Sequence, residues 1–231
     1  MKKPLLRKTA CLLFFSPLLF FTSPAQTNTS HERFGLDADI GLAIPASKDI
    51  NQVFYTGFDM SLGIKIAALR SKKLWIKPVF GLRMYTKSTD IDNDNVTESL
   101  TTVKAGLELQ YPAARWRKYA LYPLVRVDQN WCTNSFSKTY NESQIGNIRT
   151  YDVAVSDNFL KGNGPAFDAG CMLLSKSHWY IRADYEYFRP TLTVYPDFVK
   201  EAQDQGIYVP PAVRLDCSSI NLTLGANFNF R

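Results

Sequence analysis

The sequence predicts an all-β protein, and three observations lead to that prediction. Eight segments alternate apolar and polar residues with a period of two, which is typical of strands with one apolar and one polar face. The connections between these segments are alternately long and short. The N-terminus has the composition of a secretory signal peptide. Together these features predict an antiparallel, up-and-down transmembrane β-barrel with long external loops and short periplasmic turns.

The first 25 of the 231 residues are expected to be a signal peptide. A basic stretch (Lys2, Lys3, Arg7 and Lys8) precedes an apolar run at 9–22, and small residues follow at 23–25. The run is too short to span a bilayer as a helix. Its removal leaves 23 basic and 21 acidic residues, so the net charge of +6 belongs mostly to the signal and indicates no nucleic-acid partner. Residues 26–231 are predicted to form a single outer-membrane β-barrel domain.

The predicted strands follow one another along this domain. In chain order they are 33–45, 56–69, 74–86, 100–111, 119–131, 165–174, 178–188 and 218–231. Their apolar faces begin at Phe34, Phe58, Ile76, Val103, Leu121, Phe167, Trp179 and Ile220. Pro78 weakens the pattern of the third strand, because proline cannot donate to the ladder. Segment 149–156, with 191–195 or 207–215, shows enough alternation for a ten-stranded alternative, but extensions or loop structure above the membrane are preferred.

The polar faces carry charges of both signs deep within the strands, and these predict a charge network inside the barrel. Its members are Asp37, Asp39, Asp59, Lys65, Lys77, Arg83, Lys104, Glu108, Arg126, Asp128, Asp168, Arg182, Asp184 and Glu186. Eight strands enclose an interior just wide enough for side chains, so opposite charges there can neutralise one another. On a soluble, lipocalin-like barrel the same residues would form a solvated face.

Aromatic residues near the strand ends favour the membrane alternative, because amphipathic rings prefer the two interfaces of a bilayer. On the short-turn side these residues are Trp75, Trp116, Tyr119 and Trp179. On the long-loop side they are Tyr55, Tyr85, Trp131, Tyr187 and Phe188.

The C-terminal strand has a polar residue, a glycine two positions later and aromatics five and seven positions later. These are Thr223, Gly225, Phe228 and Phe230, and the pattern is similar to the assembly signal of outer-membrane barrels. From Phe34 to Phe230 the chain resembles the small outer-membrane β-barrels of the OmpA/OmpX-like porin family. The resemblance implies a monomer in the outer membrane of a Gram-negative cell envelope, in contact with its lipid and inserted by the barrel assembly machinery. Pairing of the last strand with the first would close the sheet.

No motif predicts catalysis or a cofactor. The only histidines are His31, before the first strand, and His178, which lies beside Ser177 in a predicted periplasmic turn. We therefore expect no catalytic residue and no enzyme. Asp90, Asp92 and Asp94 are a candidate divalent-metal set, but the glycine and the terminal glutamate of a calcium-binding loop are missing, and a hydrated turn is favoured.

Cys132 and Cys217 are both predicted at the external rim and are a candidate disulfide, although their strands are not neighbours. Loops 132–164 and 189–217 carry apolar and aromatic residues that could contact an external ligand or protein. A short helix is expected at 196–205, with proline at its start and Gly206 after its end.

The leading functional hypothesis is a non-enzymatic outer-membrane barrel. Its interior is plugged by charges, and its external loops serve surface interaction or envelope integrity. The alternatives are a narrow pore for small polar solutes, an outer-membrane lipid-modifying enzyme, an accessory barrel of a secretion machine, and a soluble lipocalin-like binder. An open lumen would favour the pore, and a catalytic histidine near the outer leaflet would favour the enzyme.

Overall fold

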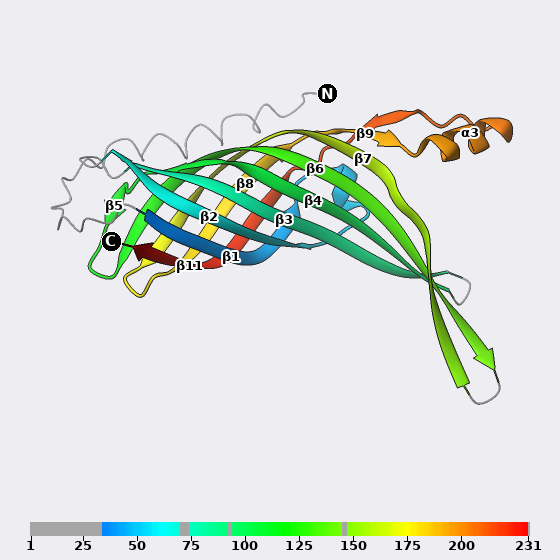
Figure 1. Ribbon diagram of the computed structural model, residues 1–231, viewed down its shortest axis with the longest axis horizontal. Coiled ribbons are helices and arrows are strands. Elements are labelled where there is room, and N and C mark those ends of the chain that lie inside the picture. Colours follow the sequence, from blue (N-terminus) through cyan, green and yellow to red (C-terminus); the bar gives the residue numbers. More distant parts are fainter. Residues whose placement is uncertain (1–33, 70–73, 92–93, 145–146, 231) are drawn as a thin grey trace, which may run out of the picture.

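Eight antiparallel strands form a closed ring in the computed structural model, which describes residues 34–69, 74–91, 94–144 and 147–230. The predicted signal peptide, 1–25, lies outside these residues. For 69, 90–91, 94–95, 136–144, 147–158 and 229–230 only the backbone is described. The ring strands, in order around the barrel, are β1 (Phe34–Pro45), β2 (Gly57–Leu69), β3 (Leu74–Ile91), β4 (Asp94–Gln110), β6 (Tyr119–Gln144), β7 (Asn147–Ser175), β8 (Trp179–Phe188) and β11 (Ser219–Phe230). The predicted eight-stranded antiparallel barrel is therefore confirmed (Figure 1).

The first and last ring strands close the barrel. β1 and β11 pair antiparallel over the full length of both, from Phe34 opposite Phe230 to Pro45 opposite Ser219. The other edge of β11 pairs with β8. Both edges of this strand are thus hydrogen-bonded, so the regular C-terminal segment does not leave an open edge, as the sequence predicts. The end of β11 lies beside the start of β1 at the short-turn end (Figure 1).

Three shorter strands lie outside the ring. β5 (Ala114–Arg115) pairs with the beginning of β6. β9 (Thr191–Val194) pairs with β7, and β10 (Ala212–Arg214) pairs with β9. The preference for eight strands over ten is thus confirmed, since 191–195 and 207–215 contribute only to these additions.

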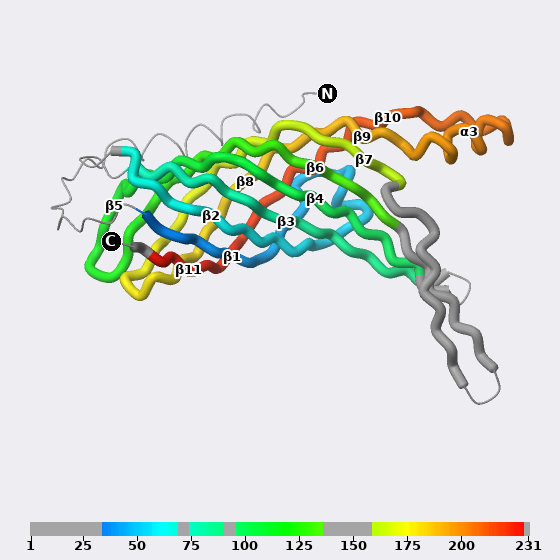
Figure 2. The backbone as a smooth tube through the Cα atoms, in the orientation of Figure 1, coloured from blue at the N-terminus to red at the C-terminus, as the bar shows by residue number. Residues whose placement is uncertain are grey.

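An arm, residues 191–214, projects from the long-loop end of the barrel (Figures 1 and 2). It holds β9, β10 and, between them, α3 (Pro196–Asp204), which begins with proline as predicted. Gly206 follows with φ 75°, a left-handed conformation that glycine adopts without strain. A second short helix, α2 (Lys48–Asn51), lies in the first long loop. No helix among the described residues is long and apolar enough to cross a membrane.

The strands of two hairpins are much longer than the sequence predicts. β3 and β4 pair as far as Ile91 and Asp94, and β6 and β7 pair as far as Gln144 and Asn147. The prediction of loops at 87–99 and 132–164 is therefore wrong, because most of these residues belong to paired strands. A hairpin that extends beyond the ring has water on both faces, so its strands need no apolar face and the period-two signal disappears.

Pro78 belongs to β3, as predicted, and its effect is local. Its backbone pairs with Leu107 of β4. On the other edge the ladder with β2 is interrupted between the pairs Gly63–Val79 and Ile66–Ile76. The missing N–H of proline accounts for this gap.

Candidate functional site in the barrel lumen and at its mouth

The outer face of the ring is apolar. Large side chains that are about half exposed there include Ile40, Leu42, Leu62, Ile64, Phe80, Leu107, Val125, Val127, Phe167, Ile181, Leu222, Leu224 and Phe228. Among the described residues, no charged side chain occupies an outward position within the ring. This holds on every ring strand, over the ranges 34–44, 58–68, 74–84, 103–109, 121–131, 165–173, 179–187 and 220–228. A surface of this size without charge is not suited to water.

The fourteen charged residues of the expected interior network are all buried, with at most 7% of each residue exposed. Five of them occupy one row of paired positions on five adjacent strands. Lys77 lies opposite Glu108, Glu108 opposite Arg126, Arg126 opposite Asp168, and Asp168 opposite Glu186. The sign of the charge alternates over the first four positions, so each of these four side chains has an opposite charge on a neighbouring strand.

Glu186 is the centre of the network towards the long-loop end. Its Oε1 lies 2.9 Å from an Arg83 guanidinium nitrogen and its Oε2 lies 2.8 Å from Lys104 Nζ. Asn130 also donates to Oε1, at 3.1 Å. Lys104 bridges onward to Asp59. One carboxylate thus joins β3, β4, β6 and β8 across the lumen.

Glu108 has the same role towards the short-turn end. Lys77 Nζ lies 2.9 Å from Oε1, and an Arg182 nitrogen lies 2.6 Å from Oε2. Lys77 also reaches Asp37 at 3.3 Å, and Arg182 holds Asp184 at 2.6 Å. Arg126 pairs with both Asp128 and Asp168.

Acidic residues outnumber basic ones in this set, eight to six, and neutral donors hold several of the carboxylates. Asp39 accepts hydrogen bonds from Ser61 Oγ at 2.8 Å and from the Tyr180 hydroxyl at 3.0 Å. Asn221 donates to Asp184 at 2.9 Å. Burying a charge is costly unless it is paired or hydrogen-bonded, and these contacts meet that requirement.

An apolar cluster lies at each end of the charged layer. At the long-loop end it contains Ala43, Ile50, Phe54, Tyr85, Leu100, Cys132, Ala166, Phe188, Leu192 and Cys217. At the short-turn end it contains Trp75, Ala120, Tyr122, Leu124, Met172 and Tyr180. Lys65 Nζ lies over the rings of Trp75 and Tyr122, at 5.3 and 5.6 Å from their centres, and so connects the second cluster to the charges.

These clusters correct part of the aromatic prediction. Trp75, Tyr85 and Phe188 were expected at the membrane interfaces, but they are buried inside the barrel. They occupy inward positions on their strands, and proximity to a strand end does not change which face a side chain is on. The other expected interface aromatics, Tyr55, Trp116, Tyr119, Trp131, Trp179 and Tyr187, are exposed.

At the long-loop end the wall of the barrel continues into a return segment, which we define as Leu215–Ser218, between the arm and β11. Its backbone is tied to the end of β8 by Leu215 N to Pro190 O (3.2 Å) and Cys217 N to Phe188 O (2.8 Å). On its other side, Ala46 N donates to Ser218 O at 2.8 Å. The return segment therefore lies between the end of β8 and the residue after β1, and it brings the first and last long connections together.

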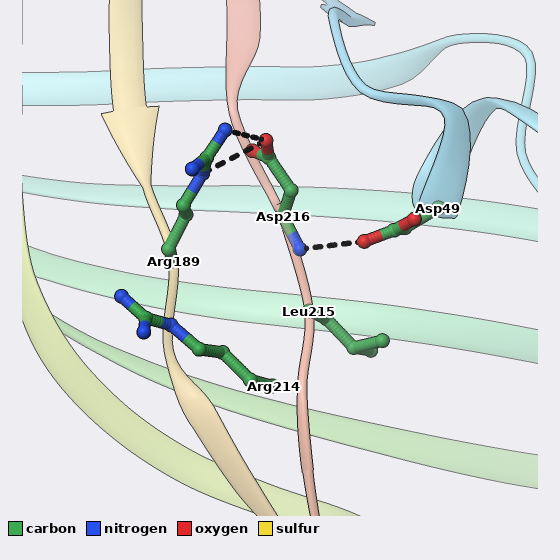
Figure 3. A pocket seen from close by; sticks show the side chains of 5 residues that line it. All are labelled: Asp49, Arg189, Arg214, Leu215 and Asp216. Carbon is green, nitrogen blue, oxygen red and sulfur yellow. Dashed lines mark hydrogen bonds and ion pairs between the residues drawn. The ribbon is translucent and has the colours of Figure 1, made fainter.

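Asp216 is the most connected residue of the return segment. Its backbone N–H donates to Asp49 Oδ2 at 3.0 Å, and its carbonyl accepts from the Ser47 hydroxyl. Its carboxylate is paired with Arg189, 2.6 Å from the nearest nitrogen, and accepts from Ser218 N. Figure 3 shows Asp216 between Arg189 and Asp49. Partial burial raises the pKa of Asp216, but the hydrogen bonds from Ser218 and Arg189 outweigh this and bring the pKa below its ordinary value.

A shallow cavity of about 380 Å³ lies beside this contact, lined by Asp49, Arg189, Arg214, Leu215 and Asp216. Both signs of charge are present, and the Arg189 side chain also lies over the Tyr187 ring at 5.0 Å. The cavity can accept a small polar group, and it combines residues from the first and last long connections. The sequence gives no sign of it, because its residues are far apart in the chain.

The C-terminal assembly pattern has a steric basis at its glycine. A Cβ on Gly225 would collide with the Tyr180 ring, so only glycine fits beneath that ring. Thr223 is buried on the same face, and Phe228 is exposed on the outer face. The backbone of Phe230 pairs with Phe34, and its side chain lies outside the described residues. Whether these residues act as an assembly signal stays a prediction.

The remaining candidate residues lie apart from the lumen. Asp90 and Asp94 belong to the β3–β4 hairpin, opposite Asn95 and Ile91, which is not the backbone of a calcium-binding loop. Their side chains, and all of Asp92, lie outside the described residues. Within the described residues, no cluster of potential metal ligands occurs. His178 has φ 67° in the exposed β7–β8 turn, where Asn227 N donates to its carbonyl, and His31 is outside the described residues.

Sequence reasoning missed the residues that fill the mouth. Ile50 and Phe54 lie between the predicted strands 33–45 and 56–69 and were assigned no role, yet both are buried in the cluster at the long-loop end. A signal was present, because Ile50, Val53 and Phe54 have the i, i+3, i+4 spacing of a short apolar helical face. Nothing comparable marks the return segment.

Comparison with known proteins gives likenesses of fold. No family model matches the chain, and no curated protein matches it significantly. Among solved structures it is similar to Ail, the attachment invasion locus protein of Yersinia pestis, in complex with the heparin analogue sucrose octasulfate (14% identity, 86% of this chain and 99% of that chain, TM-score 0.40). It is also similar to Neisserial surface protein A (12% identity, 85% of this chain and 97% of that chain, TM-score 0.44). A third similar structure is a major outer membrane protein from Thermus thermophilus (12% identity, 87% of this chain and 100% of that chain, TM-score 0.45).

These likenesses are remote, and the fold assignment rests on the barrel's own strand pairing. The eight-stranded antiparallel barrel that the sequence resemblance implies is the fold that the chain has.

Proposed function

We propose that this chain is a monomeric, non-enzymatic barrel of the outer membrane, with a blocked lumen and a long-loop end that contacts an external ligand or protein. The observation that carries the proposal is the inverted polarity of the barrel. Its outside is apolar and uncharged around the ring, and its inside holds fourteen buried charged residues. Lipid is the medium that matches such an outside, and a closed ring leaves no strand edge unpaired in it.

In this proposal, residues 1–25 direct export, and the barrel assembly machinery inserts residues 26–231. The Thr223, Gly225, Phe228 and Phe230 pattern is the proposed recognition element. The test is expression of the full chain with its signal followed by cell fractionation. We expect the protein in the outer membrane, with faster gel mobility before boiling than after it. Recovery as a soluble, heat-insensitive protein would contradict the membrane assignment and favour the lipocalin-like alternative.

The proposed block has three layers. The ion pairs centred on Glu186 and Glu108 cross the middle of the lumen, and an apolar cluster lies at each end. A solute would have to displace all three, which disfavours the narrow-pore alternative. Planar-bilayer recordings of the refolded protein should show no discrete conductance, and a steady single-channel current would refute the block.

The external role is proposed for the mouth and the arm. Tyr195, Phe198, Ile207 and Tyr208 of the arm are exposed, and the cavity beside Asp216 opens nearby. Exposed aromatic and apolar side chains at this end are suited to contact with another molecule. Protease added to intact cells should cut the arm at exposed Lys200 and leave uncut the parts of the strands that lie within the ring. Cleavage only after cell lysis would reverse the proposed orientation.

A lipid-modifying activity has little support from the described residues. Histidine is the usual general base of such enzymes, and the one described histidine, His178, is in a turn at the end opposite the mouth. Replacing both His31 and His178 should leave the lipid composition of the cell unchanged, whereas an altered composition would revive the enzyme hypothesis.

A further inference from the structure

Two cysteines from distant parts of the chain meet inside the mouth of the barrel. Cys132 is on the inward face of β6, and Cys217 belongs to the return segment before β11. Two ring strands, β7 and β8, separate β6 from β11. We propose that Cys132 and Cys217 form a disulfide that fastens the return segment to the wall of the barrel. This inference rests on the proposed function, because it requires an oxidising compartment outside the cytoplasm.

The position of Cys132 is set by a row of paired residues. Arg83 of β3 lies opposite Thr102 of β4, and Thr102 lies opposite Cys132. The Thr102 hydroxyl donates to the Cys132 sulfur at 3.6 Å. This row fixes the height of the thiol in the lumen and points it inward.

The return segment reaches the same row along the wall, as the continuation of β11. Arg83 donates to the Cys217 carbonyl at 3.4 Å, and Cys217 N donates to Phe188 O. Both cysteines are at most 2% exposed and belong to one apolar cluster. Both thiols are free in the structure, and they lie within interaction distance of each other. Two neighbouring thiols in one buried cluster have the proximity that a disulfide needs.

The third cysteine of the barrel domain cannot compete for either partner. Cys171 occupies an outward position on β7 and is exposed on the apolar face. Cys11 lies in the predicted signal peptide. The pairing in the folded barrel is therefore unique, although the number of cysteines in the domain is odd.

The bond can form by thiol–disulfide exchange with an oxidised dithiol protein of the exporting compartment. The thiolate of one cysteine attacks the donor's disulfide, forms a mixed disulfide and releases one donor thiolate. The second cysteine thiolate then attacks the mixed disulfide, which completes the new S–S bond and releases the other donor thiolate. Two cysteine thiols lose two protons and two electrons, and the donor is reduced to its dithiol. Because both sulfurs are buried in the finished barrel, exchange precedes or accompanies closure.

The consequence is a covalent link across the mouth. The bond would enclose about 85 residues, including β7, β8 and the whole arm. Cross-linking so long a segment restricts the unfolded chain, and it also keeps the return segment attached to β6 when the arm is pulled or cut.

The first test counts thiols. Protein extracted from the membrane fraction is denatured in the presence of a maleimide reagent, with and without prior reduction. We expect one labelled thiol per mature chain before reduction, at Cys171, and three after it. Cys171→Ser should give no labelled thiol before reduction and two after it. Cys132→Ser should give two labelled thiols both before and after reduction. Three labelled thiols in unreduced wild type would overturn the proposal.

The second test uses the arm. After limited proteolysis at Lys200, the sample is boiled in SDS, so that strand pairing no longer holds the pieces together. Without reductant, the wild-type fragments should migrate as one band, and with reductant as two. Cys132→Ser and Cys217→Ser should give two bands in both conditions, and Cys171→Ser should behave as wild type. Separation of wild-type fragments without reductant would also overturn the proposal.

The two failures can be told apart. Protein that fractionates with the outer membrane but has three free thiols loses the disulfide and keeps the proposed function. Protein that fails to reach the membrane loses the proposed function. In that case the pairing is decided by refolding the reduced chain in detergent with oxidised glutathione present from the start, so that exchange can occur before the barrel closes. Loss of the thiols of Cys132 and Cys217 together supports the pair, and their retention refutes it.

Discussion

The two ends of the lumen are filled in different ways. At the short-turn end, Trp75, Tyr122, Met172 and Tyr180 all come from ring strands, so the backbone ladder fixes each side chain in place. At the long-loop end, Ile50, Phe54 and Cys217 come from connections that fold back into the barrel. A side chain on a paired strand cannot move without breaking the ladder, whereas a loop can open locally. The comparison indicates that the short-turn end is rigid and that the long-loop end, the yielding end, can open locally.

The largest expected effect is at the rigid end. Tyr180→Ala removes a fully buried ring and the donor to Asp39, and we expect a loss of about 4 kcal/mol in the free energy of unfolding. Urea unfolding in detergent or lipid, followed by tryptophan fluorescence, measures this loss. Tyr187→Ala, which removes an exposed ring of the same strand, is the matched control and should cost less than about 1 kcal/mol.

The same end should be sensitive to one added methyl group. Gly225→Ala would place a Cβ against the Tyr180 ring, and overpacking of this kind costs about 1–3 kcal/mol. In a Tyr180→Ala background the same change should cost almost nothing, because the ring is gone. Additive effects in this double-mutant cycle would mean that the tight fit at Gly225 has another cause.

The yielding end should tolerate truncation better. Phe54→Ala removes a buried ring that lies 5.9 Å from the Tyr85 ring. We expect a cost of about 2 kcal/mol, near the low end for a buried apolar side chain, because the loop around it can collapse. The same unfolding assay measures it. A cost equal to that of Tyr180→Ala would remove the distinction between the ends.

The smallest effect concerns pH at the mouth. The pKa of Asp216 is lowered in the folded protein, so its contribution is present above the unfolded pKa and is lost as the pH falls through the lower, folded value. Exposed ion pairs contribute about 0.2–1 kcal/mol, so protease cleavage at Arg214 should rise by only a few-fold, and only below about pH 4. Asp216→Asn should remove this pH dependence. A change between about pH 6 and 8, where histidine ordinarily titrates, would point to another group.

Much of the barrel could be predicted because the ring strands follow a strict rule. One face must be apolar, so alternation identifies the strands and even the inward charges, from Asp37 on β1 to Glu186 on β8. The rule stops where the ring ends. For this reason the β6–β7 hairpin beyond the ring, the inserted residues Ile50 and Phe54, and the return segment left little trace in the period-two alternation.

The pairings inside the lumen were beyond prediction for a different reason. Which charges meet depends on the register between neighbouring strands, and a shift by two residues keeps every side chain on its face while changing every partner. The sequence predicts that Glu108 and Arg126 are both inside. Only the pairing of β4 with β6 places them side by side.

The row from Lys77 to Glu186 also bears on how the barrel forms. Each of the strands β3, β4, β6, β7 and β8 contributes one member, and the charged neighbours of each member arrive on other strands. In the proposed membrane, a half-assembled sheet would therefore expose unpaired charges at its growing edge, at a cost of several kcal/mol for each. Partly inserted forms are penalised, and insertion should be cooperative, because each added strand brings partners for the charges on the strand before it.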